Sequence, residues 1–248
     1  MVGVEQPVSV VLAVTVLAAG AAALAALPAA FGRRVPALAL GLGYALSTGL
    51  MLGLGFLLMQ RALERTGGLL AVAAALFAAL YTAWTHRYTG GDALDPLEPE
   101  AISAIEGYRL MIAHGLHAAS EGVALGAAMA LDLQLGIALA LAMAVQNVCE
   151  GLGLASVLAA RGVRGLDVAI LVVFSDAPQA LLAVAVFAVL PEWPGALGGV
   201  LGFGAGALLF LTLTETLPAA YRGGGRAATA AVVSAAAGAL ILLQAVVH

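Results

Sequence analysis

Apolar runs long enough to cross a lipid bilayer follow one another along nearly the whole sequence. A transmembrane helix needs about 20 apolar residues, and polar or glycine- and proline-containing breaks divide this chain into eight runs. The eight runs are Val8–Phe31, Val35–Met59, Leu69–Trp84, Leu110–Leu131, Leu133–Ala160, Val168–Leu190, Gly195–Leu217 and Ala227–Val247. No segment alternates apolar and polar residues with the period of two that a transmembrane β-barrel requires. The pattern predicts an all-α polytopic membrane protein, with eight transmembrane helices in one domain over residues 1–248.

Arginine indicates the orientation, because cytoplasmic loops are enriched in basic residues and this chain contains no lysine. The loops with odd numbers, counted from the N-terminus, and the mouth of the fourth run hold Arg33, Arg34, Arg87, Arg109, Arg161, Arg164, Arg222 and Arg226. The loops with even numbers hold only Arg61 and Arg65. We therefore expect the odd loops, including an acidic loop at about 85–106, in the cytoplasm and both termini outside. The sequence has no cluster of basic residues that would indicate binding to nucleic acid. The expected partner of the apolar helices is the lipid bilayer that surrounds them.

Two glutamates, Glu121 and Glu150, stand inside the fourth and fifth runs, and each is followed by glycine. His117 and Gln146 precede them by four residues. A charged side chain at the centre of a membrane helix costs roughly 2.5–3.5 kcal/mol on insertion scales. The sequence therefore predicts a partner that compensates for these carboxylates.

The spacing of the polar residues favours a metal ion as that partner. With about 100° per residue, His114, His117 and Glu121 fall within a stripe about 60° wide on one helix. Imidazole nitrogen and carboxylate oxygen are ligands of Zn²⁺ and other first-row divalent metals. A second helix, with Gln146 and Glu150 about 40° apart and Asn147 beside them, could complete the shell.

Each of these residues also has a structural interpretation. His117 with Glu121 can be a buried polar pair, and Gln146 with Asn147 can join helices by hydrogen bonds. His114 can be a packing residue that donates a hydrogen bond. Four further residues are open in the same way: Asp176 beside Pro178, Glu215 near the end of the seventh run, His86 at a helix end, and Met51 in the second run.

Three motifs of this chain resemble the ZIP family of divalent metal transporters, specifically its prokaryotic branch. The family pattern His-Asn-x-x-Asp/Glu-Gly is similar to the segment from His117 to Gly122. The pattern His/Gln-Asn/Asp-x-Pro-Glu-Gly is similar to the segment from Gln146 to Gly151, and Glu-x-x-Pro to the segment from Glu215 to Pro218. The GLMLGLGF run also resembles the family segment that can place a methionine, here Met51, at the metal.

The resemblance implies a bundle in which helices 1–3 and 6–8 form an inverted repeat around helices 4 and 5. It implies a bacterial or archaeal cytoplasmic membrane and a possible homodimer. It also implies a central metal site of His117, Glu121, Gln146 and Glu150 with Met51 nearby. In addition we expect Asn147 to help coordinate the metal and His114 to be a relay or gate-side ligand.

Two departures from the family pattern bear on whether the chain binds a second metal ion beside the central one. The asparagine after the first histidine is Ala118 here, and the family glutamate that precedes a proline falls on Ala177, with Asp176 one residue earlier. One residue along a helix is about 100°, so Asp176 is not a simple replacement. We predict one strong metal site, and a second that is absent or rebuilt.

The function expected from these observations is the import of Zn²⁺, or of Fe²⁺, Mn²⁺ or Cd²⁺, by alternating access. The chain is expected to be a transporter and not an enzyme, with no organic cofactor. Two other functions stay open at this stage. One is a proton-coupled transporter of a small organic solute that uses Glu121 and Glu150 as proton carriers. The other is a membrane assembly or sensor protein with a structural polar core.

Overall fold

The computed structural model describes residues 8–89 and 97–247, and its described residues are almost entirely helical. The elements are α1 (Val8–Gly20), η1 (Ala21–Ala26), α2 (Leu27–Ala30), α3 (Ala37–Thr66), α4 (Gly68–Thr89), α5 (Ala104–Leu131), α6 (Leu133–Ala160), α7 (Gly165–Val189), η3 (Leu190–Glu192), η4 (Pro194–Ala196), α8 (Leu197–Leu211), η5 (Thr212–Thr216), α9 (Leu217–Gly224) and α10 (Arg226–Val247). Within those two ranges there is no strand. The all-α prediction is therefore confirmed.

Among residues 8–89 and 97–247, six helical segments are long and apolar enough to cross a membrane. They are Val8–Ala30, Ala37–Thr66, Gly68–Thr89, Leu133–Ala160, Gly165–Glu192 and Pro194–Gly224. Together with the relative reported below, they identify a multi-pass membrane protein. Helix α5 is not among the six, since its histidines and Glu121 make it less apolar, and α10 qualifies only as a shorter apolar helix, Arg226–Leu242.

The acidic loop is shorter than the predicted range of about 85–106. Helix α4 continues to Thr89, and α5 begins at Ala104. Ser103 caps α5 because its hydroxyl accepts the Glu106 N–H while Glu106 accepts the Ser103 N–H at 2.7 Å. These hydrogen bonds, led by the side-chain one, hold the pKa of Glu106 below its usual value. Asp92 and Asp95 lie outside the described residues.

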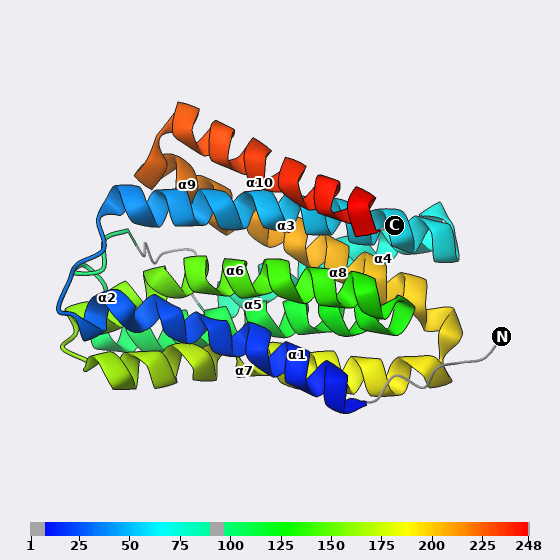
Figure 1. Cartoon of the computed structure of the whole chain (residues 1–248), viewed down its shortest axis with the longest axis horizontal. Helices are drawn as coiled ribbons and strands as arrows, with labels where there is room; N and C mark the ends of the chain where they lie inside the picture. The colour runs from blue at the N-terminus through cyan, green and yellow to red at the C-terminus, as the bar shows by residue number, and fades with distance from the viewer. Residues whose placement is uncertain (1–7, 90–96, 248) are drawn as a thin grey trace.

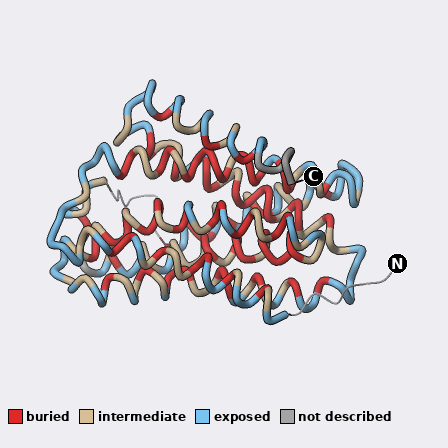
Figure 2. The backbone as a smooth tube through the Cα atoms, viewed as in Figure 1, coloured by how far each residue is buried: buried red, intermediate tan, exposed pale blue. Residues whose placement is uncertain are grey.

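The helices lie side by side along the long axis of the molecule in two groups (Figure 1). The first group contains α1 with η1, α5, α6 and α7, and the second contains α3, α4, α8, α9 and α10. The groups meet where α3 packs against α6 and where α5 packs against α8. Buried residues face the interior between helices, whereas the outward faces are exposed (Figure 2). Any polar residue on the inner faces of α3, α5, α6 and α8 is therefore brought to this junction.

Glycine sets the close approach of α5 to α7, the most extensive helix pair of the described fold. A Cβ atom at Gly122 would lie 2.4 Å from the carbonyl oxygen of Gln179. One at Gly126 would lie 2.4 Å from the carbonyl oxygen of Ala183. Small residues at such positions let membrane helices pack backbone to backbone, so these two glycines determine how near α7 comes to the polar face of α5.

Gly126→Ala is expected to destabilise the protein, because the added methyl group must displace the α7 backbone. Overpacking typically costs about 1–3 kcal/mol, and each kcal/mol lowers Tm by about 2–4 °C for a chain of this size. The matched control is Gly199→Ala on α8, where nothing lies within 4 Å of the added Cβ. Thermal unfolding of both variants in detergent checks this, and an equal Tm for the two would contradict the packing argument.

Candidate metal centre

Three acidic and imidazole side chains meet at the junction of the two helix groups. His117 and Glu121 come from α5 and Glu150 from α6, and one ligand atom of each lies within 4.8 Å of the others. His117 Nε2 is 3.2 Å from Glu121 Oε1 and 3.6 Å from Glu150 Oε2. All three side chains are buried, at 5%, 2% and 7% relative exposure. We refer to His117, Glu121 and Glu150 as the central cluster.

Helix geometry explains why each glutamate of the cluster is followed by glycine. Successive residues point about 100° apart, so when Glu121 faces α6, Gly122 faces α7 and lies against the Gln179 backbone. Likewise, Glu150 faces the cluster while a Cβ at Gly151 would lie 3.0 Å from Ala25 and 3.1 Å from Val172. The glutamate–glycine pair thus supplies a carboxylate on one face and a close helix contact on the next.

Amide side chains form a network around Glu121. Gln146 donates to Glu121 Oε1, and Gln179 Nε2 donates to Glu121 Oε2 at 2.8 Å. Asn147 Nδ2 donates to Gln179 Oε1 at 2.8 Å and to the carbonyl of Ala18 at 3.1 Å. The structure therefore places Asn147 against α1 and α7, and its link to Glu121 runs through Gln179.

In the described part of the chain, His117 Nε2 contacts only the carboxylates of Glu121 and Glu150 and makes no regular hydrogen bond, and Gln146 Oε1 is buried without a hydrogen-bond partner. Both are lone-pair ligands that a divalent cation accepts when the imidazole nitrogen is unprotonated. Leaving a buried acceptor unpaired costs about 1–3 kcal/mol. The residues present therefore fit a cation bound between α5 and α6.

Helix α3 contributes the wall opposite the cluster. The Ser47 hydroxyl donates to Glu150 Oε1. Met51 lies one helical turn further along α3, is fully buried, and has its sulfur 4.0 Å from Thr216 Oγ1. A thioether suits softer metals, and this position puts Met51 on the α3 face that carries Ser47.

Glu215 extends the cluster toward one end of the bundle. Its Oε2 is 3.9 Å from His117 Nδ1, and its Oε1 is 2.7 Å from His86 Nε2 on α4. Glu215 stands in a π-helical turn, Thr212–Thr216, a feature frequent at functional sites. Its side chain is 38% exposed, so this carboxylate joins the buried cluster to a more accessible region.

His114 and Asp176 form a separate pair beside the cluster. His114 Nε2 is 2.7 Å from Asp176 Oδ1, across the α5–α7 contact. The rings of His114 and His117 have centroids 6.1 Å apart. Neither His114 nor Asp176 shares the close three-residue grouping, and Ala118 supplies no ligand.

Sequence reasoning missed Gln179 and Ser47. Gln179 follows Asp176 by three residues, which places both on one side of α7, so an amide in this apolar run was a usable signal. Ser47 had no comparable signal, because a serine in a membrane helix is common and inexpensive to bury. Only the packing of α3 against α6 identifies it.

The central cluster lacks a permanent positive charge. In the described ranges, no arginine forms an ion pair with Glu121 or Glu150, and the ion pairs of Glu215 are to histidines. Buried carboxylates of like sign repel each other strongly at low effective dielectric. A cation with two positive charges relieves this repulsion most directly.

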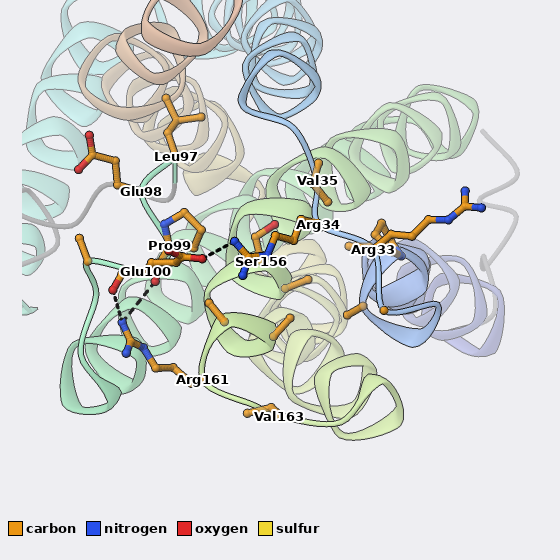
Figure 3. A pocket seen from close by; sticks show the side chains of 18 residues that line it. Arg33, Arg34, Val35, Leu97, Glu98, Pro99, Glu100, Ser156, Arg161 and Val163 are labelled. Atoms are coloured by element: carbon orange, nitrogen blue, oxygen red, sulfur yellow. Dashed lines mark hydrogen bonds and ion pairs between the residues drawn. The ribbon is translucent and has the colours of Figure 1, made fainter.

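A cavity of about 920 Å³ lies elsewhere, at the end of the bundle between α2, the α6 terminus and residues 97–101 (Figure 3). Arg34 pairs with Glu100 at 2.5 Å across it, and Arg161 donates to the Glu100 carbonyl at 2.8 Å. None of the cavity's lining residues belongs to the central cluster. The central cluster is thus separate from this cavity and lies among buried side chains.

Comparison with known proteins agrees with this chemistry. No family model matches the chain. A protein of Arabidopsis thaliana named “Putative zinc transporter” is 30% identical over 219 residues, which cover 87% of this chain and 35% of that protein. The chain therefore spans about a third of the length of this curated relative. The relationship is consistent with the resemblance of the motifs to the ZIP family, and it supports metal transport in general.

Zn²⁺ or Cd²⁺ is expected to raise the thermal stability of the purified protein, because a ligand that binds only the folded state stabilises it by about 2.7 kcal/mol at 100 times Kd. His117→Ala and Glu150→Gln should lose most of this increment. Glu192→Gln, which removes an exposed carboxylate, is the matched control and should keep it. If the metal raised Tm equally in the parent and in all three variants, the metal would bind elsewhere in the protein.

Proposed function

We propose that this chain is a ZIP-type transporter that carries Zn²⁺, or a similar divalent cation, into the cytoplasm by alternating access. The observation that carries the proposal is the buried His117–Glu121–Glu150 grouping, three ligands from two helices with no arginine to neutralise them in the described structure. Gln146 completes the set, since its amide group reaches Glu121 and its carbonyl oxygen has no hydrogen-bond partner in the described structure. The zinc-transporter name of the plant relative supports the same substrate class.

The proposal includes eight membrane crossings, with α5 and α10 added to the six apolar segments. Helix α5 has the length to cross, 28 residues, and packs against α6, α7 and α8. Its polar residues face those neighbours and not lipid, which is how ionisable groups are tolerated within membranes. The inverted repeat of the outer helices, the cytoplasmic odd loops and the outward termini are parts of the same proposal.

The ligand set suits transport better than permanent binding. Structural zinc sites are closed by four strong ligands, usually thiolates and imidazoles. Here one imidazole, two carboxylates and one amide oxygen offer a weaker shell, and Asn147 contributes by fixing Gln179 and through it Glu121. An inside-negative membrane potential favours inward movement of a dication by about 4.6 kcal/mol per 100 mV. Release from a weak shell can then proceed without nucleotide hydrolysis.

The exit path proposed for the ion runs from His117 to Glu215 and then to His86. The three side chains are joined by contacts of 3.9 Å and 2.7 Å. Helix α4 ends at Thr89, and α9 follows the π-turn that holds Glu215. Both therefore point to the end of the bundle with the arginine-rich loops, which is the cytoplasmic side in this proposal.

Purified protein in proteoliposomes is expected to take up Zn²⁺ or Cd²⁺, and His117→Ala should reduce the initial rate at least tenfold, because it removes the only imidazole of the cluster. Glu192→Gln should transport at the parent rate. Uptake of none of zinc, cadmium, iron and manganese would contradict the proposal. A proton current that depends on Glu121 without metal uptake would favour an organic-solute transporter instead.

Glu215→Gln is expected to slow transport several-fold while leaving the metal-induced rise in Tm intact. The substitution weakens the next ligand on the path but leaves the central cluster in place. Stopped-flow uptake and thermal unfolding of the same preparation separate the two effects. A parallel loss of both would place Glu215 among the primary ligands and not on the exit path.

A further inference from the structure

The His114–Asp176 pair is more deeply buried than a surface ion pair and is incompletely satisfied. Asp176 is 1% exposed, and its Oδ1 lies 2.7 Å from His114 Nε2. Its second oxygen, Oδ2, is buried without a partner in the described part of the protein. The pair is thus an expensive arrangement to retain for helix packing alone, since a buried charged pair can often be replaced by apolar residues without loss of stability.

Helix packing here has another source. Helices α5 and α7 are already held in register by the glycine contacts at Gly122 and Gly126. Gly115, next to His114, also lies against α7, where a Cβ would be 3.4 Å from the Ser175 carbonyl oxygen. The pair is therefore not needed to bring the two helices together, and a chemical role is the better explanation for it.

The orientation of the imidazole indicates that role. An ionised carboxylate only accepts hydrogen bonds, so an ionised Asp176 would accept a hydrogen bond from His114 Nε2 and, on a neutral imidazole, leave the lone pair on Nδ1. No other hydrogen bond or ion pair of His114 occurs within the described residues. Histidines that bind metal characteristically donate their other ring nitrogen to a carboxylate in this way, which fixes the tautomer and raises the basicity of the ligand.

His114 lies beside the central cluster. His114 precedes His117 by one turn of α5, and their ring centroids are 6.1 Å apart. That turn lies toward the α5 N-terminus, which follows the loop that holds Glu100. A cation that leaves His117 in this direction would meet a second imidazole before it lost its protein ligands.

We propose that His114 is a transient metal ligand through Nδ1 and that Asp176 is the positioning residue that orients it, forming a transfer station beside the transport site. The inference rests on the proposed function and adds to it a second station at which a divalent cation is held by one imidazole and water. It differs from the family's second metal, whose positions are Ala118 and Ala177 in this chain.

The test replaces the His114 imidazole by a thiolate, which can bind a metal ion without a carboxylate to fix its protonation. The variants are His114→Cys, Asp176→Asn and the double variant, with Cd²⁺ uptake measured in proteoliposomes. A thiolate binds Cd²⁺ directly, so His114→Cys should retain cadmium uptake within about threefold and lose more of its zinc uptake. Asp176→Asn should slow uptake about tenfold with His114 present, because an amide can donate to Nε2 and so release the tautomer. In the His114→Cys background, Asp176→Asn should have almost no effect.

A second readout does not depend on transport. Cadmium added to His114→Cys should produce thiolate-to-cadmium absorption beyond that of the parent, whose single Cys149 contributes to both proteins equally. If Asp176→Asn were equally harmful in both backgrounds, Asp176 would be structural and the inference wrong. His114→Ala with parent rates, or the absence of the new absorption, would also overturn it. If the new absorption appeared but neither the parent nor any variant took up metal, the proposed transport function would be rejected. The assignment of position 114 as a metal ligand would then still stand.

Discussion

The interaction on which the rest of the structure depends is the mutual repulsion of buried carboxylates that no arginine neutralises. Glu121 and Glu150 lie within reach of the same histidine, and every basic partner in the described interior is an imidazole. The surrounding amides and the Ser47 hydroxyl donate hydrogen bonds to these oxygens. Such donors stabilise a carboxylate but do not cancel its charge, so the site remains electrostatically prepared for a cation.

That constraint explains the form of the packing around it. A glutamate in a membrane helix must face the protein interior, and a glycine directly after it brings the neighbouring helix close enough to exclude lipid and water. Gly122 allows this close packing against α7, and Gly151 allows it against η1 and α7. The network from Gln146 to Gln179 and Asn147 then spans three helices without a gap. Charge placement and small-residue placement are therefore two parts of one local design.

Sequence periodicity was sufficient for the helical class and for placing His117 and Glu121 on one face of α5, because residues four apart lie on the same side of a helix. It was not sufficient for contacts between helices distant in sequence. The approach of Ser47 to Glu150, of Glu215 to His117 and of Gln179 to Glu121 depends on tertiary packing that no local pattern encodes. Asn147 illustrates the limit: its spacing suggested a direct ligand, yet its amide is directed at α1 and α7.

The distribution of the proposed ligands over the two helix groups would link binding to movement. His117, Glu121, Gln146 and Glu150 all belong to the group of α1, α5, α6 and α7, whereas Ser47, Met51 and Glu215 belong to the group of α3, α4 and α8. A sliding of one group against the other would keep the four proposed ligands together and, of the contacts described here, break those of the cluster to Ser47 and Glu215. The bound ion would then travel with its main ligands and exchange the remainder of its shell at each side. His114 and Asp176, which lie wholly within the first group, would travel with it.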